Sequence, residues 1–118
     1  TGAGVKTILD YLGGTEFPKS FWAYDLFEHE EGMLHHSMPL HGKDLYERVK
    51  AKFKDYHQVK VIKGKIPDVF SGQSPEKISF LHIDLNQAPA EIAALEALFD
   101  RVVPAGMIIL VMIVWLAR

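Results

Sequence analysis

At Phe80-Leu81-His82-Ile83-Asp84-Leu85-Asn86, an apolar run ends in a carboxylate and a turn. An amphipathic segment with Pro89 in its first turn follows, and a second apolar run extends over Met107–Leu116. This order of strand, turn, helix and strand is typical of a parallel α/β sheet. Ligands of such sheets bind where the strands end. Asp84 is therefore the first candidate for a functional side chain.

The composition predicts a single small domain over residues 1–118. Apolar residues make up 48% and charged residues 24%, which favours a globular protein over a disordered one. A net charge of −2 gives no electrostatic case for nucleic acid. The chain has no cysteine, which excludes disulfides and thiolate metal sites and favours a cytoplasmic location. The apolar run at the end is shorter than the roughly 20 residues that span a bilayer, so no membrane partner is expected.

Helical and strand patterns alternate along the rest of the chain. The strands on either side of the last helix are almost continuously apolar, so we expect helices on both faces of the sheet. In that last helix we expect Ile92, Leu95, Leu98 and Phe99 to face the core. Residues 27–42 lack a periodic pattern and are expected to form a long loop. The predicted helices are Val5–Leu12, a segment that begins at Asp44 or Lys43 and includes Phe53, and a segment from Pro89, with a turn or short helix at Ile66–Phe70. The predicted strands are Phe21–Tyr24, Val59–Lys63, Ile78–Asp84 and Met107–Val114.

Several segments resemble, in order and spacing, the class I S-adenosylmethionine-dependent methyltransferases, and in particular the macrocin O-methyltransferase (TylF-like) family. The resemblance covers roughly residues 21–110. It implies an α/β fold, a partial Rossmann-like three-layer sandwich with a mostly parallel sheet in which the family's first strand is missing. The matching segments are Tyr24–Glu28, Leu45–Val49, Val61–Asp68, Ile78–Asn86 and Ala94–Leu98, leading into Val103–Gly106.

The resemblance implies a binding site for S-adenosylmethionine. Asp25, at the end of the family's second strand, would accept hydrogen bonds from the ribose hydroxyls. The turn at Gly64 and Lys65 would lie near the adenine. Gly2 and Gly4 would be the last residues of the glycine-rich loop, whose backbone approaches the methionine part of the cofactor. From the residues alone, Asp25 is equally a turn-forming carboxylate.

The resemblance also implies a divalent cation such as Mg²⁺, bound by Asp84 with Asn86 as a neutral oxygen donor. The competing interpretation is that Asp84 caps the following helix. The family places an Asp-Asp-Tyr motif at the end of its fifth strand, but here Leu110 runs into the apolar stretch Val111–Trp115. Apolar side chains do not bind a hard cation.

The codons of Val-Met-Ile at positions 111–113 can be written so that Asp-Asp appears in another reading frame. We therefore hypothesise a frame slip near Val111 in the gene. Sequencing the locus and measuring the mass of the protein test this hypothesis. An unbroken frame that ends in these residues contradicts it.

The resemblance implies an O-methyltransferase that acts on a sugar or small-molecule hydroxyl, inactive or weak as this chain and without an assignable catalytic base. The missing strand predicts that the second and fourth strands pair directly or that the chain borrows a strand as a homo-oligomer. A non-catalytic α/β fragment that is stable as an oligomer is the alternative. A nucleotide-binding module of another doubly wound family is a third interpretation.

The remaining chemistry-bearing residues have structural explanations. The spacing of His29, His35, His36 and His41 fits no zinc pattern and indicates a solvated loop. His82 is expected in the core or an interface, and Trp22 and Trp115 in the core. Six lysines do not form a single stripe with interleaved aromatic residues, as a nucleic-acid-binding surface would. They indicate solvated faces of the protein: Lys50, Lys52, Lys54, Lys60, Lys63 and Lys65.

Overall fold

The computed structural model describes residues 2–27, 44–85 and 87–111. They fall into two compact units. The first contains the described residues up to Gly64, and the second contains those from Lys65 onward. Each unit is an α/β arrangement with one pair of parallel strands, which confirms the predicted fold class at this level.

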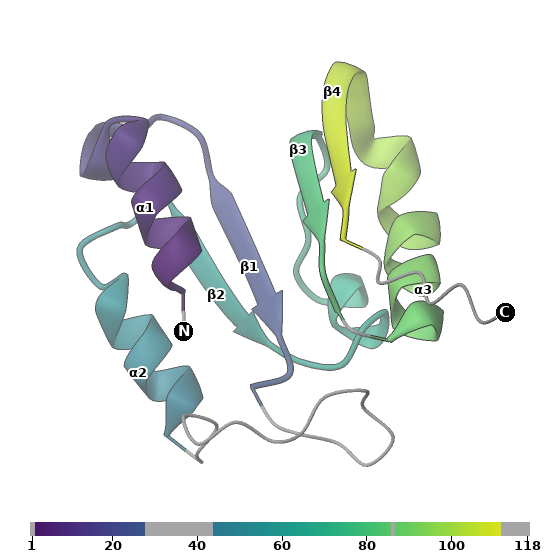
Figure 1. Ribbon diagram of the computed structural model, residues 1–118, viewed down its shortest axis with the longest axis horizontal. Helices are drawn as coiled ribbons and strands as arrows, with labels where there is room; N and C mark the ends of the chain where they lie inside the picture. Colours follow the sequence, from purple (N-terminus) through teal and green to yellow (C-terminus); the bar gives the residue numbers. More distant parts are fainter. Residues whose placement is uncertain (1, 28–43, 86, 112–118) are drawn as a thin grey trace, which may run out of the picture. The chain divides into compact units, whose positions relative to one another are not determined.

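The first unit contains two helices and two strands in alternation. Parallel pairing places Phe21 opposite Val59 and Asp25 opposite Lys63. Figure 1 shows that both helices run against the direction of the strands, so the helices begin at the end where the strands finish. The elements are α1 (Ala3–Tyr11), the 3₁₀ turn η1 (Gly14–Glu16), β1 (Phe21–Asp25), α2 (Leu45–Lys52) and β2 (Val59–Lys63).

The core of the first unit lies between the two helices and one face of the strands. Leu45, Val49 and Phe53 recur at intervals of four residues and are buried, as their helical spacing predicts. They pack with Leu9 of α1, whose exposed fraction is 0%. Alternate strand residues, including Val61, complete this face.

On the other face of this strand pair, Trp22 stacks with Tyr24 at a ring distance of 6.3 Å. The Lys60 ammonium lies 4.1 Å from the centre of the Trp22 ring. Trp22 is half-buried and lies outside the buried cluster, so its predicted place in the core is wrong.

The second unit contains one long helix and two strands. Leu81 pairs with Ile108 and Ile83 with Leu110, but the register is irregular between Ile78 and Phe80. Figure 1 shows α3 beside the β3–β4 pair. The elements are η2 (Asp68–Ser71), β3 (Ile78–Ile83), α3 (Ala88–Leu98), η3 (Phe99–Arg101) and β4 (Val102–Leu110).

The last strand begins at Val102, five residues earlier than the sequence predicts. The segment before Met107 is an irregular part of the strand, in which Ala105 has a φ of +64°. A Cβ on Gly106 would lie 2.7 Å from Val102 Cγ1 and 2.8 Å from the Val103 carbonyl oxygen. Glycine is therefore required where the chain folds closely on itself.

The burial predictions for this unit are only partly confirmed. Leu98 is buried as predicted, but the side chains of Ile92 and Phe99 are 56% and 57% exposed, so their predicted place in the core is wrong. The other buried positions of α3 are Glu91 and Ala94. The strands are not buried on both faces. Phe80 and His82 pair with Met107 and Ile109 on one face, and all four are exposed, so His82 is not a core residue.

The strands that the structure describes form two sheets of two strands, β1–β2 and β3–β4. The predicted direct pairing of the second family strand with the fourth, here β1 with β3, would join the two units and stays a prediction. The predicted loop lies almost wholly outside the described residues, as do its four histidines, Trp115 and the end of the last predicted strand.

We predict that Leu9→Ala lowers the free energy of unfolding by about 2–5 kcal/mol, because it leaves a cavity at a fully buried position. Urea denaturation followed by circular dichroism measures this change. The neighbouring Ile8→Ala is the matched control. The Ile8 side chain is 44% exposed, so its truncation is expected to cost less than about 1 kcal/mol. Equal losses in the two variants would contradict the packing described above.

Candidate functional site

Asp25 ends β1 in a turn that its own side chain forms. Its Oδ1 accepts the backbone N–H of Phe27 at 2.9 Å. Phe27 has a φ of +58°, and its buried ring lies 5.2 Å from the ring of Tyr46 on α2. The turn is therefore anchored in the core of the first unit, while the Asp25 side chain stays exposed at the strand end.

The structure brings Gly64 next to Asp25. The Gly64 N–H donates to the Asp25 carbonyl oxygen at 3.1 Å, which extends the strand pairing by one residue. Lys65 follows directly, and its carbonyl oxygen accepts the N–H of Val69 at 2.9 Å. Asp25 and Gly64, two of the residues predicted to bind the cofactor, are thus in contact at one strand end. The third, Lys65, follows Gly64 in the chain.

The two predicted loop glycines lie at the start of α1. Gly2 precedes the helix with a φ of +75°, and a Cβ there would lie 2.9 Å from Phe53 Cε2. Gly4 is already inside the helix, and a Cβ there would meet nothing within 4 Å. Because Gly2 has no side chain, the start of α1 can pack closely against Phe53 at the end of α2. Figure 1 places this helix start at the end of the unit where β1 and β2 finish.

Asp84 follows β3 and is exposed, whereas Asn86 lies outside the described residues. The Val111 N–H donates to the Ile83 carbonyl oxygen at 3.0 Å, so an apolar residue ends the neighbouring strand beside Asp84. Across the described residues, no group of three or more His, Cys, Asp or Glu side chains could hold a metal ion. Those residues alone do not fit a Mg²⁺ site.

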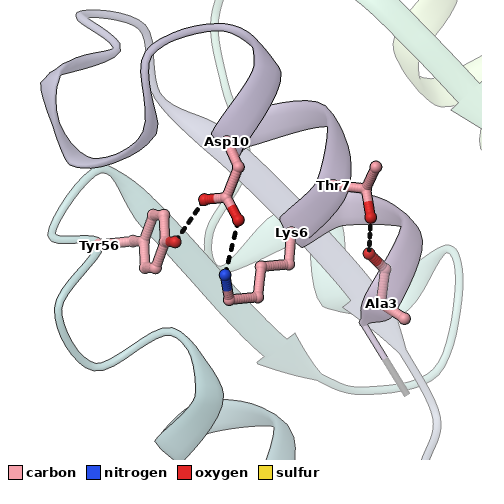
Figure 2. Close-up of polar contacts among 5 residues, drawn as sticks. All are labelled: Ala3, Lys6, Thr7, Asp10 and Tyr56. Atoms are coloured by element: carbon pink, nitrogen blue, oxygen red, sulfur yellow. Dashed lines mark hydrogen bonds and ion pairs between the residues drawn. The ribbon is translucent and has the colours of Figure 1, made fainter.

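A surface cluster in the first unit joins α1 to the segment before β2 (Figure 2). The Lys6 ammonium lies 2.6 Å from Asp10 Oδ2, and the Tyr56 hydroxyl donates to Asp10 Oδ1 at 2.5 Å. The hydrogen bond from Lys6, then that from Tyr56, lowers the pKa of Asp10, and the bond to Asp10 raises the pKa of Lys6. The Lys6–Asp10 pair has the helical spacing that sequence reasoning can find. Tyr56 is 46 residues from Asp10 in the sequence, so no local spacing predicts the contact between them.

None of the helices in the described part of the chain combines the length and the apolar character that crossing a membrane requires.

An acidic residue at the end of one parallel strand, with a glycine turn at the end of the next, defines an α/β protein with a candidate ligand site at its strand ends. A family model described as macrocin-O-methyltransferase (TylF) matches residues 16–114. The chain therefore belongs to the macrocin-O-methyltransferase (TylF) family, which confirms the resemblance found in the sequence. Neither a curated protein nor a solved structure matches the chain. The matched range includes Asp25, Gly64 and Asp84 but not Gly2 or Gly4.

We predict that Asp10→Asn lowers the Tm at neutral pH and that the difference from the unchanged protein shrinks in acid. A lowered pKa in the folded state means that Asp10 stabilises the fold above its ordinary pKa, and that this stabilisation is lost as the pH falls through the lowered pKa. The raised pKa of Lys6 has the opposite sign, so its contribution is lost only at strongly alkaline pH.

Thermal unfolding between about pH 2 and pH 9 measures the effect, since an aspartate titrates near pH 4. Asp55→Asn, at an exposed position of the same unit, is the control and is expected to change the Tm little. A difference between Asp10→Asn and the unchanged protein that stays constant down to pH 2 would refute the prediction.

Proposed function

We propose that this chain is an S-adenosylmethionine-dependent O-methyltransferase whose acceptor is the hydroxyl of a sugar or small molecule. The observation that supports this proposal is the family match together with the strand end at Asp25 and Gly64. Methyltransferases use S-adenosylmethionine generally, and when bound it would supply an activated methyl group on a sulfonium.

The residues at this strand end suit a ribose and its base. Asp25 holds one carboxylate oxygen in the turn, and the exposed side chain can accept hydrogen bonds from ribose hydroxyls. Gly64 presents no side chain beside it, so a flat base can approach the backbone there. Lys65 would contribute to the adenine side of the site. Gly2 and Gly4 would lie near the methionine part, since α1 begins at the same end of the unit.

Metal assistance by Mg²⁺ is a separate part of the proposal. It comes from the family resemblance, and Asp84, with Asn86, would provide oxygen ligands. A divalent cation of this kind needs several oxygen donors. The described residues supply too few, so we assign no step to a metal ion. No general base is assigned either, and we expect methyl transfer by this chain to be weak or absent.

We further propose that residues 1–118 form one partial Rossmann-like domain, and that the chain self-associates. The family match runs through both compact units, which supports a single domain. A sheet of two strands is marginally stable by itself. Additional strands from a second copy would stabilise both pairs.

A non-catalytic oligomer is the second candidate function, favoured by one observation. Phe80, Met107 and Ile109 expose 39–58% of their surface on one face of the β3–β4 pair, and the exposed Val111 directly follows β4. An apolar surface of this kind is more typical of an interface than of a site for a polar substrate.

We predict that the chain binds S-adenosylhomocysteine and that Asp25→Asn weakens this binding about tenfold or more, since a hydrogen bond to a charged group contributes about 1.5–3 kcal/mol. Isothermal titration calorimetry measures the affinity. Asparagine keeps the oxygen that accepts the Phe27 N–H, so the turn is retained while the charge is lost.

Asp55→Asn is the matched control, because it removes an exposed carboxylate elsewhere in the same unit. Titrations with and without Mg²⁺, and with Asp84→Asn, test the metal part. If the unchanged protein gives no binding heat and sediments as a concentration-dependent oligomer, the methyltransferase proposal is wrong and the second candidate stands.

A further inference from the structure

Glu91 is buried, although the helical pattern of the sequence places Ile92 and not Glu91 on the core side of α3. It lies in the first turn of α3, and its side chain faces inward with an exposed fraction of only 8%. The Ile92 side chain next to it is 56% exposed. Burying a carboxyl group in place of an isoleucine is unfavourable unless the carboxyl group finds hydrogen-bond partners.

The partner of Glu91 is the backbone just after β3. Glu91 Oε1 accepts the N–H of Leu85 at 3.2 Å, six residues back along the chain. The Glu91 N–H in turn donates to the Gln87 carbonyl oxygen at 3.0 Å, which fixes the residue in the first helical turn. The side chain therefore bridges the connection from β3 to α3.

This contact is consistent with how α3 is rotated about its axis. Glu91, Ala94 and Leu98 lie at helical spacing and form the buried side of the helix. If Ile92 and Phe99 faced inward instead, Glu91 would turn outward, and the Leu85 N–H would lose its acceptor just past the end of the strand. An unpaired N–H at a half-buried residue costs free energy.

We infer that Glu91 is a positioning residue that fixes the turn after β3 and, through it, the placement of Asp84. Asp84 directly precedes Leu85, so the hydrogen bond restrains the peptide that follows Asp84. The role of Asp84 in a site rests on the proposed function. The restraint on the turn rests on the contact with Leu85 alone.

Amide hydrogen exchange and ¹⁵N relaxation of the whole chain test this inference at single residues. In Glu91→Leu, the Leu85 amide should exchange at least tenfold faster, and the order parameters of Asp84 and Leu85 should fall. Amides of β3 that pair with β4 should keep their protection. Glu91→Gln keeps an acceptor oxygen of the same reach and should retain most of the Leu85 protection.

If leucine does not fit at this position, Glu91→Ala replaces Glu91→Leu in the test, because it also removes the acceptor and introduces a smaller side chain. Glu96→Leu, at an exposed position of the same helix, is the control and should leave Leu85 unchanged. Unaltered Leu85 exchange in both Glu91→Leu and Glu91→Ala overturns the inference, as does equal loss of protection in Glu91→Gln. A chain that binds no S-adenosylhomocysteine but shows the expected exchange pattern refutes the proposed function and leaves the role of Glu91 intact.

Discussion

The packing of α1 and α2 on one face of the β1–β2 pair is the constraint on which the first unit depends. The connection between two parallel strands must run back along them, and α2 does so between β1 and β2. Figure 1 shows that α1 also begins at the end where the strands finish. The buried Leu9 and the four-residue spacing of Leu45 and Val49 hold the helices in this arrangement. As a result, Asp25 and the start of α1 lie at one end of the unit, where α/β proteins bind their ligands.

The turns after β1 and β3 are stabilised by the same kind of interaction. A backbone N–H just past a strand end has lost its partner in the sheet and must find another acceptor. After β1, the Asp25 carboxylate accepts the Phe27 N–H, and after β3, the Glu91 carboxyl group accepts the Leu85 N–H. Asp25 accepts an N–H within the turn that it begins, and its side chain stays exposed. Glu91 is buried in α3 and accepts an N–H from six residues earlier in the chain. In this way both strand-end aspartates are placed by bonds to the backbone.

The chain belongs to the macrocin-O-methyltransferase (TylF) family, and the matched range covers both Asp25 and Asp84. Just past β4, the N–H of the apolar Val111 donates to the carbonyl oxygen of Ile83, the residue that precedes Asp84. The two strand ends therefore differ. The strand end at Asp25 retains polar groups suited to a ribose, while the strand end at Asp84 has one carboxylate beside an apolar neighbour.

Local patterns in the sequence determined the elements, because helix and strand periodicities act over a few residues. The spacing of Leu45, Val49 and Phe53 located α2, and Val59–Lys63 is a strand with the predicted bounds. Contacts formed only in the folded chain decided the rest. The buried side of α3 includes Glu91, whose carboxyl group accepts the Leu85 N–H, and a Cβ on Gly106 of β4 would lie 3.3 Å from the Ser79 carbonyl oxygen of β3. Asp25 and Asp84 were candidates from their places after strands, but the contacts of Gly64 and Glu91 come only from the pairing of elements in space, which a one-dimensional pattern does not encode.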